Sequence, residues 1–75
     1  MLKIKDIKWV NGYKIKVLFD GNNEKICDLS DFLEKGDFVE LKDISLFKQF
    51  RNTGLSIEWP NELDLSSDTL FYIGN

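Results

Sequence analysis

The sequence contains no histidine, a single cysteine (Cys27) and a single proline (Pro60) in its 75 residues. Histidine is the commonest general base and the commonest metal ligand, so the chain lacks the residue that most often serves in either role. With one cysteine and no histidine, the chain cannot build a Cys/His zinc site, a Cys–His or Ser–His catalytic pair, or an internal disulfide. We therefore predict that Cys27 is a small core or edge residue and that the protein is not an enzyme.

The chain also lacks an apolar run long enough for a signal peptide or a membrane span. We therefore expect a cytoplasmic protein in a reducing setting, with no membrane association. A length of 75 residues corresponds to one domain, which we assign to residues 1–75. Because 43% of the residues are hydrophobic and 13% are aromatic, this domain has enough apolar material for a core.

Neither a phosphate-binding loop nor a dinucleotide-binding fingerprint occurs in the sequence. The stretch "DGNNEKICDLSD" has oxygen-bearing side chains at several positions of a calcium loop. However, Lys25 stands where such a loop needs glycine, and Asp31 stands where it needs the longer glutamate. We therefore expect no cofactor and no metal.

The net charge of −3 makes duplex nucleic acid an unfavourable partner, because DNA binding needs clustered Lys and Arg. Lysines nevertheless gather in the N-terminal part of the chain, and acidic residues follow them. We interpret this as two solvated faces of opposite sign. The alternative is a basic face that docks an acidic partner or nucleic acid, for which the candidates are Lys3, Lys5, Lys14 and Lys16.

Apolar residues alternate with Lys14, Lys16 and Leu18 over residues 13–19, which predicts a half-buried strand. Asn11–Gly12 before it is a hairpin signal, and the apolar phase of the preceding strand slips at residues 5–6, which predicts a bulge. A three-residue loop, which places Trp9 beside Tyr13 and Ile7 beside Ile15, keeps the apolar side chains on one face.

A third strand is predicted over residues 24–28, with Ile26 opposite Val17. A short helix follows over residues 30–36, where Ser30 suits the N-cap and Gly36 the C-terminal stop. We expect a turn or short helix near residues 44–46, a hairpin around residues 52–54, and a last helix capped by Ser66 or Ser67. The fold class is therefore α+β, a small antiparallel sheet of about five short strands in β-β-β-α-β-β-α order, packed with two short helices.

The stretch "SIEWPNELDLSSDTLF" places a polar elbow between the last predicted strand and the last helix. Pro60 ends the strand, and we expect Trp59 to be a core residue whose indole N–H finds a carbonyl, rather than a platform for a base. Asp64 and Asp68 lie four apart and are interpreted as favouring the helix N-terminus, rather than as an acid–base pair. The elbow residues, which form either a recognition site or a structural corner, are Trp59, Asn61, Asp64 and Asp68. We expect Asn61 and Asp64 to bond local backbone donors.

Several stretches in order resemble a family of small bacterial proteins, the domain of unknown function 2442: "YKIKVLFDGNNEKICDLSDFL", "FVELKD" and "IEWPNELDLSSDTLFY". The resemblance covers nearly the whole chain, with one departure, since Phe71 takes the place of the usual tyrosine and Tyr72 follows it. The matching positions are Phe19, Asp20, Gly21, Asp28, Leu29, Leu41, Asp43, Phe47, Trp59, Asn61, Glu62, Asp64, Leu65, Asp68, Leu70 and Tyr72.

The resemblance implies a compact α+β domain without established catalysis. Members are often encoded beside a second small protein, in an arrangement like a toxin–antitoxin pair, and others precede a helix-turn-helix segment, for which this chain has no room. We therefore expect a protein-binding module, the antitoxin-like or regulatory half of such a pair. The alternatives are a nucleic-acid-associated accessory protein, which would use the lysine-rich N-terminal hairpin, and a small inhibitor of another protein. A protein partner is expected, and open sheet edges also allow a homodimer.

Overall fold

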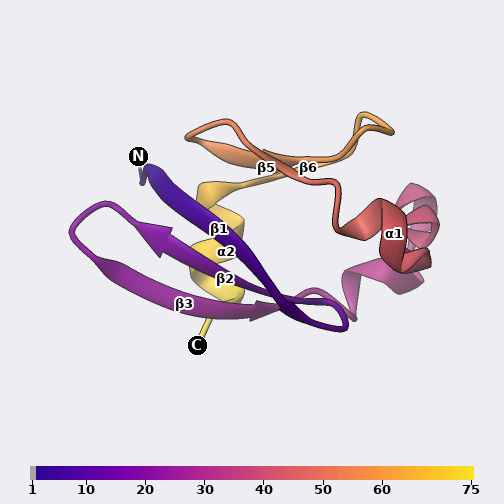
Figure 1. Cartoon of the computed structure of the whole chain (residues 1–75), viewed down its shortest axis with the longest axis horizontal. Coiled ribbons are helices and arrows are strands. Elements are labelled where there is room, and N and C mark those ends of the chain that lie inside the picture. The colour runs from indigo at the N-terminus through magenta and orange to yellow at the C-terminus, as the bar shows by residue number, and fades with distance from the viewer. Residues whose placement is uncertain (1) are drawn as a thin grey trace.

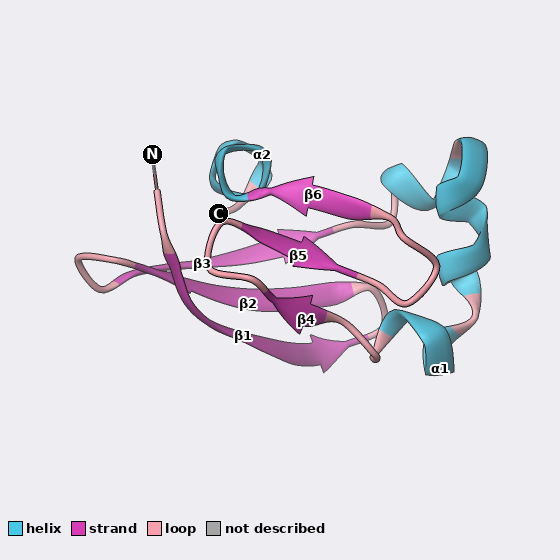
Figure 2. Ribbon diagram, turned by 90° about the horizontal axis from the view of Figure 1, so that it is seen from above, coloured by secondary structure: helices cyan, strands magenta, loops and turns pink. Residues whose placement is uncertain are grey.

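The computed structural model describes residues 2–75, which form two antiparallel three-stranded sheets and two α-helices. The first sheet has the order β1 (Ile4–Asn11), β2 (Lys14–Phe19) and β3 (Asn23–Asp28). The second has the order β4 (Arg51–Asn52), β5 (Ser56–Glu58) and β6 (Asp64–Ser66) and lies over the first (Figures 1 and 2). The α+β class is confirmed, but one sheet of about five strands becomes two sheets with six strands.

The first hairpin pairs Ile7 with Val17 and Trp9 with Ile15, and its predicted bulge lies between Ile4 and Asp6. The predicted partners, Ile15 for Ile7 and Tyr13 for Trp9, were wrong by two residues. The cause is a second irregularity between Trp9 and Asn11. A shift by two residues leaves every side chain on the same face of the strand. Burial of one apolar face therefore could not distinguish the two registers.

β3 pairs Cys27 with Ile15, and Ile26 with Lys16, so the prediction that Ile26 faces Val17 was wrong by one residue. This register turns Cys27 into the core, where its side chain is fully buried as predicted, and leaves Ile26 half-buried on the outer face. At the outer edge of β3, the N–H groups of Ile26 and Asn75 each donate to the other's carbonyl at 3.0 Å. Asn75 therefore covers part of this sheet edge.

The helix predicted over residues 30–36 is instead a pair of 3-10 segments, η1 (Phe32–Glu34) and η2 (Gly36–Lys42). Ser30 is not the cap. Its N–H and hydroxyl donate to the Asp28 carboxylate at 3.0 and 2.6 Å, and this local turn diverts the backbone from a regular helix start. Gly36 has a φ of +53°, which ends the first segment and starts the second.

α2 lies where the sequence predicted a helix, and α1 lies where it predicted a turn or a short helix. α1 (Ile44–Phe47) is one short turn, capped by the Asp43 side chain, which accepts from the Ser45 N–H at 3.0 Å. α2 (Ser67–Ile73) begins after Ser66, whose hydroxyl accepts from the Thr69 N–H at 3.2 Å. The predicted hairpin around residues 52–54 is also present, as β4 and β5.

The core lies between the two sheets and is closed by the helical segments. Each sheet contributes the inward face of its alternating strands, as period-two burial requires. The buried apolar residues are Ile4, Ile7, Ile15, Val17, Phe19, Cys27, Leu29, Leu33, Leu41, Phe47, Ile57, Trp59, Leu65 and Leu70. Among residues 2–75, no helix combines the length and the apolar character needed to cross a membrane.

Candidate functional site

The polar elbow is a β-hairpin with a three-residue loop, residues 60–62, between β5 and β6. The Trp59 N–H donates to the Leu63 carbonyl at 2.9 Å, and the Glu62 N–H donates to the Trp59 carbonyl at 3.1 Å. Glu62 has a φ of 69°, the left-handed residue with which many three-residue hairpin loops end. Pro60 ends β5 as predicted, but the chain then turns back and pairs as β6.

Trp59 fixes this hairpin to the rest of the protein. Its side chain is 4% exposed, and its indole N–H donates to the carbonyl of Phe47 at 2.9 Å. Its ring packs near the rings of Phe47 and Phe38, with centroids 5.9 and 6.4 Å away. The prediction of a core tryptophan with a carbonyl partner is confirmed, and the hairpin therefore has a rigid base.

The other elbow residues lie apart from one another. Asn61 donates its side-chain N–H to the Glu40 carboxylate at 3.0 Å, so the prediction that it bonds local backbone was wrong. Its Oδ1 is buried and has no hydrogen-bond partner within residues 2–75. Asp64 lies in β6, three residues before α2, because pairing with β5 extends the backbone there. Only Asp68 lies in the first helical turn, as predicted.

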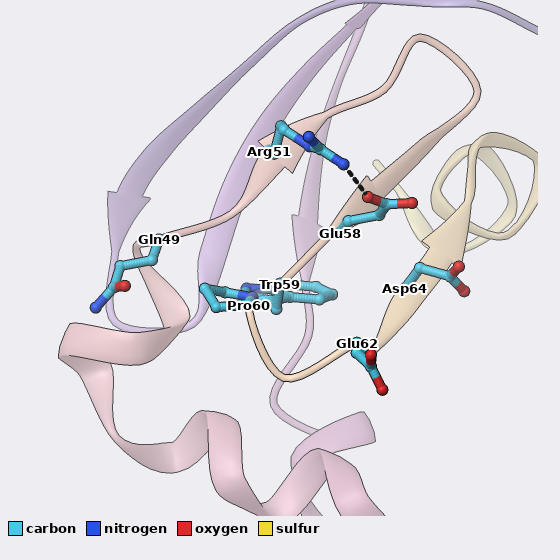
Figure 3. A pocket seen from close by; sticks show the side chains of 7 residues that line it. All are labelled: Gln49, Arg51, Glu58, Trp59, Pro60, Glu62 and Asp64. Carbon is cyan, nitrogen blue, oxygen red and sulfur yellow. Dashed lines mark hydrogen bonds and ion pairs between the residues drawn. The ribbon is translucent and has the colours of Figure 1, made fainter.

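A groove of about 540 Å³ opens beside this hairpin, on the outer side of the second sheet (Figure 3). The strand register places Glu58 between Arg51 and Asp64 in one cross-strand row, and Arg51 forms an ion pair with Glu58 at 2.6 Å. Glu62 adds a further carboxylate from the loop. The lining residues are Gln49, Arg51, Glu58, Trp59, Pro60, Glu62 and Asp64.

The groove carries three carboxylates against one guanidinium, so its formal charge is −2. Trp59 and Asp64 had been singled out from the sequence, whereas Gln49, Arg51 and Glu58 had not. Gln49 and Arg51 come from another segment, and only the pairing of β4, β5 and β6 aligns Arg51 with Glu58 and Asp64. No local sequence signal could have revealed that row.

The four candidate lysines do not form one basic face. Lys14 and Lys16 point outward from β2, whereas Lys3 precedes β1 and Lys5 lies at its bulge, with its ammonium donating to Asn22 at 3.2 Å. The outer face of the first sheet also includes Lys8, directly opposite Lys16. Acidic residues interleave with these lysines on the same face, namely Asp6, Glu24 and Asp28. Three positive and three negative charges therefore balance there.

Among residues 2–75, the side chains of Cys27 and Asp28 have shifted pKa values. Burial raises the pKa of the Cys27 thiol to about 11, partly opposed by the positive charge of Lys25. Hydrogen bonds from the hydroxyl and the N–H of Ser30 lower the pKa of Asp28. Within residues 2–75, no three His, Cys, Asp or Glu side chains gather as a metal site.

These features define a small α+β protein of two antiparallel sheets, with an acidic groove on the outer side of the second. Residues 4–74 match the family described as "Protein of unknown function (DUF2442)", and the chain belongs to this family, as its motifs had indicated. Searches of the curated proteins and of the solved structures found no match.

Proposed function

We propose that this protein is a cytoplasmic protein-binding module without catalysis or a cofactor, and that it is the antitoxin-like or regulatory half of a two-gene pair. The observation that carries the proposal is the groove beside Trp59 (Figure 3). A preformed concave surface on rigid strands suits recognition, because little conformational entropy is lost when a partner binds.

The charges of the groove favour a partner segment that contains lysine or arginine. Glu58 is already paired with Arg51, but neither Glu62 nor Asp64 forms an ion pair within residues 2–75. Both residues are exposed, so their carboxylates are accessible to a partner. An arginine of the partner could bind one of them through two parallel hydrogen bonds, the strongest geometry for such a pair.

The nucleic-acid alternative has weaker support. The lysines that would contact phosphates are separated along the first sheet, and acidic side chains interleave with them. Counterion release needs several cations along one path of the nucleic-acid backbone. The small-inhibitor alternative uses the same groove and differs only in the identity of the partner.

Co-expression with the product of the neighbouring gene, followed by size-exclusion chromatography, tests the proposal. We expect the two proteins to co-elute, and we expect the double variant Glu62→Lys/Asp64→Lys to lose the complex. The matched control is Asp20→Lys/Asp37→Lys, which changes the net charge equally at exposed carboxylates away from the groove. Absence of a complex, or equal loss in both double variants, would contradict the proposal.

A further inference from the structure

β1 is the outermost strand of the first sheet, and its free edge lies along one side of the molecule (Figure 2). The Leu29 N–H donates to the Tyr13 carbonyl, so the odd-numbered residues of β2 bond β3. Hydrogen bonds alternate sides along an antiparallel strand, so the even-numbered residues of β2 bond β1. Their partners are Asp6 and Lys8, and the backbone groups of Ile7 between them therefore point to the open edge.

The open part of this edge is short and has defined ends. At the start of β1, the Ile4 N–H donates to the Gly54 carbonyl at 2.7 Å, and the Asn52 side chain donates to the Ile4 carbonyl at 3.3 Å. Register irregularities follow Ile4 and Trp9, so only residues 6–9 form a regular stretch between them. An unpaired edge of this kind is a template for another strand.

We propose that β1 pairs antiparallel with β1 of a second copy of this chain, with Ile7 opposite Ile7 of the partner copy. In this two-fold arrangement the two Ile7 residues exchange their backbone hydrogen bonds. Asp6 then faces Lys8 of the partner copy, and Lys8 faces the partner copy's Asp6. Two cross-strand pairs of opposite charge form at the interface.

Charge selects this register over its neighbours. A shift by two residues would place the two Lys8 side chains opposite each other, and like charges in that position destabilise a sheet. A shift by four would centre the pair on Trp9, where the irregularity before Asn11 interrupts the strand. Lys8 already stands opposite Lys16 within its own sheet, so a carboxylate on its other side relieves this repulsion.

The charged side chains are accessible for these contacts, although they already form a long ion pair within one chain. Within one chain the Lys8 ammonium lies 4.0 Å from Asp6, and the two side chains are 74% and 52% exposed. On the opposite face, Trp9 is 38% exposed, although it is one of the largest apolar residues of the chain. The proposed register places Ile7 of the partner copy diagonally across from Trp9, which removes part of this apolar surface from water.

Sedimentation equilibrium across a range of protein concentrations tests the pairing. We expect a monomer–dimer equilibrium, weakened on the order of 30-fold by Asp6→Lys or by Lys8→Asp, because each substitution makes both cross-strand pairs repulsive. An equimolar mixture of these two variants restores complementary pairs and should dimerise as the original protein does. Each chain in the mixture still lacks the ion pair between Asp6 and Lys8 of the same chain, so loss of that pair cannot explain the rescue.

Glu24→Lys and Lys14→Asp are the matched controls, since they make the same charge changes on the same sheet face away from the β1 edge. They should leave dimerisation unchanged. A second test fixes the register: mixed Asp6→Cys and Lys8→Cys proteins should form an intermolecular disulfide on mild oxidation, and either alone should not. A protein that stays monomeric at all concentrations, a mixture that is not rescued, or controls that weaken the dimer equally would overturn the proposal.

Discussion

Replacement of Trp59 by phenylalanine tests the claim that this residue anchors the groove. The substitution removes the donor to the Phe47 carbonyl, and a buried acceptor without a partner costs about 1–3 kcal/mol. The smaller ring also leaves a void that we estimate at about 1 kcal/mol. The sum is about 2–4 kcal/mol, compared with about 4–11 kcal/mol for the stability of a domain of this length.

Trp9→Phe is the matched control, because Trp9 is 38% exposed, compared with 4% for Trp59, and water can replace the hydrogen bond from its indole to the Gly12 carbonyl. Urea unfolding followed by circular dichroism should give a loss below about 1 kcal/mol for this variant. Each variant retains one tryptophan, so fluorescence reports the other site: emission from Trp59 should be blue-shifted relative to that from Trp9. Equal stability losses in the two variants would refute the anchoring role.

Three further results are expected from other positions. Glu62→Gly should raise the free energy of unfolding by about 0.5–1 kcal/mol, because a non-glycine residue is strained at this positive φ; unchanged or lower stability in urea would contradict it. Cys27 should not react with a thiol reagent at pH 8 until the protein unfolds, because burial raises its pKa to about 11; fast labelling of folded protein would show an open core. Asp28 has a pKa below its ordinary value of 3.8, so it stabilises the fold above that value, and this contribution is lost as the pH falls through the lower folded pKa. Stability of the Asp28→Asn variant should therefore depend less on pH in this acidic range.

Elements with a strong local signal were predictable from the sequence. The alternation ending at Phe19 sets the face of β2, and the phase slip near Lys5 marks a real bulge. Ser66 combines a capping side chain with an apolar run after it, and α2 begins there. In each case one short stretch contains all the chemistry that determines the structure.

Features that depend on distant pairing were not predictable. β6 is only three residues long and contains one buried apolar residue, Leu65, so its sequence is too short to show an alternating pattern. The strand forms because β5 offers hydrogen bonds to it. The same holds for the row of Arg51, Glu58 and Asp64, which only the register assembles. The prediction of a helix over residues 30–36 was wrong for a local reason. The Asp28 carboxylate accepts a hydrogen bond from the Ser30 N–H, and this turn replaces the regular start of a helix.

The two backbone hydrogen bonds between Asn75 and Ile26 limit how far copies of this protein can assemble through the first sheet. A sheet with two free edges can add copies without end and grow into fibres. Here the backbone of Asn75 bonds Ile26 and covers part of the β3 edge, which hinders growth of the first sheet beyond a pair. Removal of Asn75 should expose that second edge and make the protein more prone to form higher assemblies.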